Sequence, residues 1–397
     1  MDGILKLMEK VEFPNLFSGS FEINRVAFSV FGIDVYWYGI IIALGVIIAF
    51  IYAMRRAKKF GLIADHVFDV VFVAIIFGFI GARAYYCIFI DTQINFFDLR
   101  HGGLAIYGGI ISAAIAAAIM CVIRKVKLPA LFDLGGLGLL IGQCIGRWGN
   151  FVNQEAYGAP TAGTLPWGMT GTIIINDPVV VAEQNALDAA GEGIYALVHP
   201  CFLYESLWCL IGFIALHFYS KKLRSFDGEI FLLYVTWYGL GRFWIEGLRT
   251  DSLYIGDTGI RVSQLVAGIS AIIALGLFIF CKLTKTKKKG YTIYKDTALC
   301  AERLEAYAKR QQIIEEKEKA KKAMKRAEEQ APSILAEDDE KPSSDVPEST
   351  ADTEKTAEST ENADTADNED KTEDKSEDEA TEDSESVSEH DGENTEE

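Results

Sequence analysis

The sequence predicts an all-α integral membrane protein with seven transmembrane helices and a small extracytoplasmic cap. Half of the 397 residues are apolar, and seven apolar stretches approach the length of about 20 residues that a helix needs to cross the hydrocarbon core. Basic residues gather in every second connection between these stretches, as they do on the cytoplasmic side of membrane proteins. Buried helices of a soluble protein are the alternative for any one stretch, but seven together argue against it.

The seven stretches lie within residues 35–290, which we expect to form one transmembrane body. Glycines and single charges interrupt several of them, so each end is defined only to within a few residues. The stretches are 35–54, 67–90, 104–123, 128–145, 202–219, 230–246 and 262–281.

Charge in the connections predicts the orientation. The basic residues that follow the first, third, fifth and seventh stretches are Arg55, Arg56, Lys58 and Lys59; Arg124, Lys125 and Lys127; Lys221, Lys222 and Arg224; and Lys282, Lys285, Lys287, Lys288 and Lys289. The other side has few cations, and none between Trp148 and Ser220. The positive-inside rule then places the N-terminus outside and the C-terminus in the cytoplasm.

Three segments flank or interrupt the body. Residues 1–34 have no apolar run of the signal-peptide kind, and we expect an interfacial arm on the outer face. Residues 159–198 are rich in turn residues and predict the cap. Residues 291–330 are rich in helix formers of mixed charge and predict a charged cytoplasmic helix.

Residues 331–397 contain 27 Asp and Glu, 4 Lys and no aromatic residue. Such a composition buries too little surface to fold, so we expect a disordered acidic cytoplasmic tail. The formal net charge of −18 arises in this tail and says nothing about a substrate. We expect no nucleic-acid partner.

The cysteines predict neither a disulfide framework nor a metal site. There are seven, none in a C-x-x-C motif, and most fall inside the apolar stretches. This is the pattern of small buried residues. We expect no metal and no cofactor.

The most informative polar motif follows the fourth stretch, at residues 146–155, and reads Gly-Arg-Trp-Gly-Asn-Phe-Val-Asn-Gln-Glu. Charged groups at membrane depth are costly and usually serve function. If the helix continues past Arg147, Asn150 shares its face, whereas Glu155 reaches that face only if the chain turns back. A guanidinium is a planar fork of donors suited to phosphate. The alternative is a purely structural Arg–Glu pair.

Four further polar clusters stand on the same side of the membrane. They are Trp37, Tyr38 and Gly39; His101 with the glycines that follow it; His199, Tyr204 and Glu205; and Tyr238, Arg242 and Glu246, followed by Arg249 and Asp251. Each has a structural alternative, such as an interfacial aromatic anchor at Tyr38 or an i,i+4 pair between Arg242 and Glu246. Together they predict a basic, proton-competent pocket for a lipid with a phosphate headgroup.

These motifs, over residues 30–285 and in this order, resemble the bacterial prolipoprotein diacylglyceryl transferases. The resemblance implies a seven-helix bundle in the bacterial cell membrane. It implies transfer of the sn-1,2-diacylglyceryl group of phosphatidylglycerol to the lipobox cysteine of a prolipoprotein signal peptide, with release of sn-glycerol 1-phosphate. This reaction forms a thioether, is the first step of lipoprotein maturation and takes place among bilayer lipids. Tyr107 and Phe202 depart from the family pattern, as does the acidic tail.

By motif match, the resemblance makes Arg147 the phospholipid-binding arginine and Arg242 the second essential one. We expect both to hold the phosphate, His101 to deprotonate the thiol, and Glu155 and Glu246 to orient the arginines. The expected catalytic residues are His101, Arg147, Arg242 and Glu246. The expected substrate-binding residues are Arg147, Tyr38, Asn150, Glu155, Gly158 and Tyr238.

Two other functions remain open. A transporter or flippase for an anionic lipid would also need a basic pocket, but it should show broken helices and often internal repeats. Another membrane lipid-group transferase, such as an acyltransferase, is the second alternative. It has no need of polar groups on the outer side, because common acyl donors are cytoplasmic.

Overall fold

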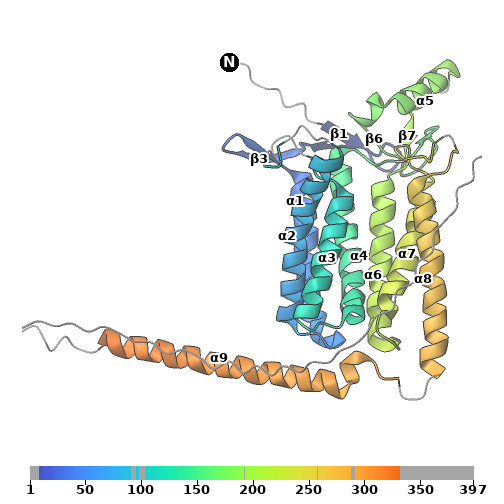
Figure 1. The fold of residues 1–397 in the computed structure, drawn as a ribbon. Helices are drawn as coiled ribbons and strands as arrows, with labels where there is room; N and C mark the ends of the chain where they lie inside the picture. Colours follow the sequence, from blue (N-terminus) through green and yellow to red (C-terminus); the bar gives the residue numbers. More distant parts are fainter. Residues whose placement is uncertain are drawn as a thin grey trace, which may run out of the picture. The chain divides into compact units, whose positions relative to one another are not determined.

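The computed structural model describes residues 9–90, 95–97, 103–191, 193–256, 258–287 and 291–330. His101 and the acidic tail at 331–397 lie outside the described residues. The fold is mostly helical, and several helices run alongside one another as a bundle (Figure 1).

Six helices in the described ranges are long and apolar enough to cross a membrane. They are α1 (Trp37–Arg56), α2 (Ala64–Phe89), α3 (Ile106–Ile123), α4 (Leu128–Asn153), α6 (Cys201–Lys222) and α8 (Val262–Lys287). The predicted seventh is α7 (Glu229–Glu246), which has three charged residues, Glu229, Arg242 and Glu246, within its 18 residues and is not among these six. Six of the seven expected helices are thus long and apolar enough to be membrane spans.

The helices pack in a definite order. α1 lies against α4, α2 against α3, and α7 against α8, while α4 also contacts α6 and α7. Trp208 of α6 and Trp237 of α7 stack with ring centroids 4.4 Å apart. Each indole N–H donates to the backbone carbonyl of the other tryptophan, at 2.8 and 2.9 Å. Both indole donors are therefore satisfied in an apolar setting, and α6 is fixed against α7.

Short strands gather at one end of the bundle, which we call the strand end (Figure 1). β1 (Glu9–Glu12), β2 (Ser20–Ile23) and β6 (Thr170–Gly171) form an antiparallel sheet in the order β2-β1-β6. β3 (Val26–Val30) and β4 (Ile33–Tyr36) form a hairpin, and β5 (Pro160–Thr161) pairs with β7 (Leu197–Val198). The expected outer arm is thus a set of strands, and β1 joins it to the expected cap.

The cap segment contains a 3-10 helix, η2 (Ile174–Asn176), and a helix that the turn residues did not predict, α5 (Pro178–Ala189). The Asp177 side chain caps α5 by accepting a hydrogen bond from the Val179 N–H at 2.8 Å. Val11 of β1, Met169, Ile174, Val180, Val198 and Phe202 form a small apolar core here. This core supports the segments that follow α4 and precede α6.

The opposite end of the bundle, the basic end, holds the cationic connections. It includes two 3-10 helices, η1 (Ala57–Phe60) and η3 (Tyr294–Asp296), and the start of α9 (Ala298–Gln330). The fully buried Asp133 accepts from the backbone N–H groups of Gly228 and Phe231, at 2.9 and 3.0 Å, and pairs with Arg224 at 3.0 Å. The carboxylate thereby fixes the start of α7 against α4.

Candidate functional site

The Arg147 motif is the last part of α4, which continues to Asn153, beyond the predicted end at residue 145. The motif has no proline, and its two glycines do not end the helix, so the helix continues past the apolar pattern. The chain then turns at Gln154 and Ala156, whose φ angles are 51° and 58°. Gln154 is buried, and its side-chain oxygen accepts from the Ile173 N–H at 3.0 Å.

This turn brings Glu155 back to the face of Asn150, as the spacing predicts. Asn150 Nδ2 donates to Glu155 Oε1 at 2.8 Å, and the Arg147 Nη1 lies 3.5 Å from Asn150 Oδ1. The three expected phosphate-site residues of this motif therefore form one hydrogen-bonded chain at the strand end of α4.

Glu205, in the second turn of α6, lies at the centre of the site. Its carboxylate forms ion pairs with Arg147 of α4 and with Arg242 of α7, the latter at 2.6 Å, and Arg249 lies 3.9 Å away. The Glu205 side chain is only 4% exposed, whereas Arg147 and Arg242 are 20% and 18% exposed. A buried acid thus holds arginines from two helices, and each arginine side chain stays partly exposed.

Arg242 also pairs with Glu246 one turn further along α7, at 2.6 Å. The i,i+4 pair within α7 is therefore confirmed, and Arg242 has a second partner on α6. Glu246 is 2% exposed. We call Arg147, Glu205, Arg242, Glu246 and Arg249 the arginine–glutamate cluster.

Arg249 follows α7 and makes two hydrogen bonds to Asp251, at 2.8 and 2.5 Å. Burial alone would raise the pKa of Asp251, but the hydrogen bond and charge of Arg249 outweigh it and hold that pKa below its ordinary value. The same contacts raise the pKa of Arg249 against the effect of burial. The pair is therefore charged at neutral pH.

Two tyrosines border the cluster. Tyr38, at the start of α1, lies within electrostatic reach of Glu155 and Arg147. Its ring lies on Gly149, where an added Cβ would stand 2.7 Å from Tyr38 Cδ2, so no larger residue fits there. Tyr238 of α7 is in electrostatic reach of Arg147, Glu205 and Arg242. The hydroxyl groups of both tyrosines therefore interact electrostatically with Arg147.

Gly158 joins three segments of the site rather than facing a cavity. Its N–H donates to the His199 carbonyl at 2.9 Å, and it forms an antiparallel bridge with Arg249. An added Cβ would meet His199 Cβ at 2.8 Å and Cys201 Sγ at 2.9 Å. The glycine lets the chain after α4 lie against the start of α6 and against the segment that carries Arg249.

The structure brings together all but one of the expected site residues, namely Tyr38, Arg147, Asn150, Glu155, Gly158, Tyr238, Arg242 and Glu246. The exception, His101, lies outside the described residues. The expected catalytic and substrate-binding residues did not include Glu205 and Arg249, although both belong to the polar clusters that predicted the pocket. A carboxylate inside the apolar stretch 202–219 was the signal for Glu205, because such a group needs a cationic partner. Within the described ranges, no group of three or more His, Cys, Asp or Glu side chains could hold a metal ion.

Long apolar helices with a buried arginine–carboxylate cluster at one end define a multi-pass membrane protein. Residues 25–280 match the family model described as prolipoprotein diacylglyceryl transferase. The chain is 42% identical over 267 residues to the phosphatidylglycerol--prolipoprotein diacylglyceryl transferase of Finegoldia magna, covering 66% of this chain and 96% of that relative. It is 40% identical over 279 residues to the enzyme of that name from Staphylococcus haemolyticus, covering 69% and 92%.

The chain belongs to the prolipoprotein diacylglyceryl transferase family. It is accordingly a transferase of the bacterial cell membrane, and the resemblance found in the sequence motifs is confirmed. The match ends before η3 and α9, so these two elements lie outside the part of the chain that defines the family.

Proposed function

We propose that this protein transfers the sn-1,2-diacylglyceryl group of phosphatidylglycerol to the lipobox cysteine thiol of a prolipoprotein. The products are a thioether-linked lipoprotein precursor and sn-glycerol 1-phosphate. The observation that carries the proposal is the arginine–glutamate cluster, in which one buried carboxylate holds Arg147 and Arg242 from separate helices at the strand end of the bundle. The family relatives carry the name of this activity.

The chemistry is a substitution at the glyceryl C3 carbon. The sulfur of a thiolate forms the new C–S bond, and the C–O bond to the phosphate breaks with its electron pair on oxygen. A phosphodiester with one negative charge then becomes a phosphomonoester with two. Arg147 and Arg242 stabilise this growing charge as donors fixed in advance in a site of low dielectric.

The carboxylates act on the arginines. Glu205 and Glu246 are nearly buried and hold Arg242 from two sides, and Asn150 links Arg147 to Glu155. Tyr38 and Tyr238 stand beside these groups and bind the headgroup. A free thiol has a pKa of about 8.5, so a base must remove its proton near neutral pH. We assign this role to His101.

We also propose that α7 is a seventh membrane span. Its 18 residues extend roughly 27 Å, close to the hydrocarbon thickness of about 30 Å. Its three charged residues are all paired, Glu229 with Lys282 at 2.5 Å and the other two within the cluster. Pairing lowers the cost of placing them in a membrane.

The distribution of cations supports an orientation with the strand end and the N-terminus outside and the basic end in the cytoplasm. The arginine–glutamate cluster then faces the outer leaflet. Its partners there are phosphatidylglycerol, the signal peptide of a prolipoprotein with its lipobox cysteine, and the surrounding bilayer lipids.

The experiment is reconstitution of the full chain with phosphatidylglycerol and a cysteine-containing lipobox peptide. Mass spectrometry should find the peptide with a thioether-linked diacylglyceryl group and an equal amount of glycerol phosphate. Acylated peptide without glycerol phosphate would indicate an acyltransferase instead. Movement of labelled lipid between leaflets without any modified peptide would indicate a transporter, although the described helices show no midplane break of the kind typical of transporters.

A further inference from the structure

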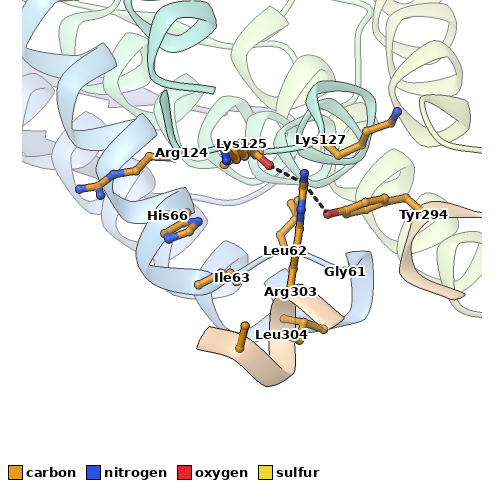
Figure 2. A pocket seen from close by; sticks show the side chains of 12 residues that line it. Gly61, Leu62, Ile63, His66, Arg124, Lys125, Lys127, Tyr294, Arg303 and Leu304 are labelled. Atoms are coloured by element: carbon orange, nitrogen blue, oxygen red, sulfur yellow. Dashed lines mark hydrogen bonds between the residues drawn. The ribbon is translucent and has the colours of Figure 1, made fainter. Parts of the chain in front are cut away.

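A small basic cavity lies at the basic end, away from the arginine–glutamate cluster. Its volume is about 180 Å³. One wall comes from Leu62, in the link before α2, and from His66, in the first turn of α2; a second comes from the link between α3 and α4 (Figure 2). The third wall comes from Tyr294 of η3 and from Arg303 and Leu304 of α9. This third wall lies outside the family match, which ends at residue 280.

The lining combines cations with apolar surface. It includes Arg124, Lys125, Lys127 and Arg303, and no Asp or Glu. Arg124 pairs with Asp69 at 2.8 Å. In the described part of the chain, the other three cations make no ion pair. The lining therefore carries three cations without an ion-pair partner among the described residues, over an apolar floor that includes Leu62, Val126 and Leu304.

Arg303 stands at the centre of this lining, between Lys125 and Tyr294 (Figure 2). Its Nη1 donates to the Lys125 carbonyl at 3.0 Å and to the Tyr294 hydroxyl at 3.3 Å. These bonds fix the guanidinium through one nitrogen, which leaves the remaining donors of the fork for an anion. Lys125 and Lys127 are exposed and flank it from the neighbouring link.

The position of the cavity relative to the membrane indicates the kind of anion. α3 ends at Ile123 and α4 begins at Leu128, so the link between them lies where membrane helices meet the headgroup layer. Pockets for drug-sized ligands have volumes of about 300–1,000 Å³, so this smaller cavity suits a single phosphate group better than a nucleotide. Basic pockets at the ends of membrane helices bind anionic lipid headgroups.

We infer that this cavity is a second anion site, which takes the phosphate group of an anionic lipid and thereby holds the start of α9 on the body. It is distinct from the transfer site, because Leu128 and Arg147 are roughly 28 Å apart along α4 at about 1.5 Å per residue. The ligand chemistry is a phosphate ester, and the membrane surface is its source.

Hydrogen exchange tests this inference on the full chain in phosphatidylcholine nanodiscs, with and without phosphatidic acid. The backbone amides of residues 298–307 should exchange at least about tenfold more slowly with phosphatidic acid, because a ligand that binds the docked state stabilises it by mass action. Soluble glycerol phosphate added to phosphatidylcholine nanodiscs is the second arm. Protection by the soluble ester alone would support an anion site but overturn the lipid as its source.

The variant Lys125→Gln/Arg303→Gln should lose this protection, and the matched control Lys321→Gln/Lys322→Gln, on the exposed part of α9, should keep it. Lys127→Gln, which removes only an exposed charge, provides a second test if the double variant unfolds. Equal protection in the cavity variants and in the wild type would overturn the inference, as would the absence of protection by either ligand. Because the cavity is remote from the transfer site, these variants should retain diacylglyceryl transfer, which separates this test from that of the proposed function.

Discussion

At the scale of single residues, Glu205 carries more of the site than the sequence alone indicated. It is the one acid in contact with guanidinium groups from both α4 and α7 among the described residues. An isolated charge in an apolar helix signals that a partner exists but not which one. The pairing of Glu205 with Arg147 depends on the packing of α6 against α4, which no spacing within the sequence specifies.

The first prediction concerns this carboxylate. Glu205→Gln leaves Arg147 and Arg242 close together without their shared counter-charge, and loss of one partner of a buried ion pair costs about 3–5 kcal/mol. We expect a lower thermal unfolding temperature in detergent and a loss of turnover of about 100-fold as the arginines move out of position. Glu22→Gln, at a half-exposed acid of β2, is the control. Normal turnover in Glu205→Gln would show that the arginines need no such support.

The second prediction concerns pH. Burial lowers the pKa of His199 from its ordinary value of 6.5. The folded protein therefore favours the neutral imidazole. As the pH falls below 6.5, the unfolded chain binds a proton that the folded protein does not, so the free energy of unfolding decreases. An acid limb in kcat/KM at pH 6.5 or above must then belong to another group, for which His101 is our candidate.

The pH profiles of two variants check this assignment. His101→Asn should remove the acid limb, whereas His199→Asn should leave the limb in place. If the limb survives in His101→Asn, a group other than that imidazole takes the thiol proton.

At the scale of elements, the sequence predicted the apolar helices well because their hydrophobic pattern is local. It placed the end of α4 too early, since a polar motif on a helix that continues past the apolar stretch looks like a loop. It also missed the strands of residues 9–36. Their partners are β6 and one another, and β6 is two residues long and far away in the sequence.

The third prediction tests the junction of α6 and α7. Trp208→Phe and Trp237→Phe each remove an indole donor. The carbonyl that accepts from it lies inside a helix and keeps its intrahelical hydrogen bond, so each variant loses one hydrogen bond worth about 0.5–1.5 kcal/mol. Thermal unfolding of both single variants and of the double variant should show effects that do not add, because the rings also stack on each other. Strict additivity would mean that the two helices do not depend on this contact.

At the scale of the whole molecule, the site is built by elements far apart in the sequence. α1, α4, α6 and α7 each contribute to it, and the segment around Gly158 ties together the strand ends of α4, α6 and α7. The order of the motifs along the chain was enough to indicate the family, because each motif is one continuous segment at the end of a helix. The contacts between motifs could be described only from the structure.

The fourth prediction separates the parts of the chain beyond the family match. Tyr294 and Cys300 are buried in the core cluster that contains Leu134 and Ile230. A chain ending at Gln330 should keep wild-type transfer and thermal stability, whereas one ending at Gly290 should unfold at a lower temperature because it loses these core residues. Equal stability of the two truncated proteins would show that η3 and the start of α9 are dispensable to the body.

The proposed transfer reaction depends most directly on Arg147, which holds the phosphate. The decisive measurement is the transfer rate from labelled phosphatidylglycerol to a lipobox peptide by Arg147→Ala, with Arg310→Ala on the exposed face of α9 as the control. Removal of a single charge-stabilising donor typically costs about 100- to 1,000-fold in rate. We therefore predict that Arg147→Ala folds in detergent but loses at least about 100-fold of its transfer rate, while the control is normal. Near-normal transfer by folded Arg147→Ala would contradict the account.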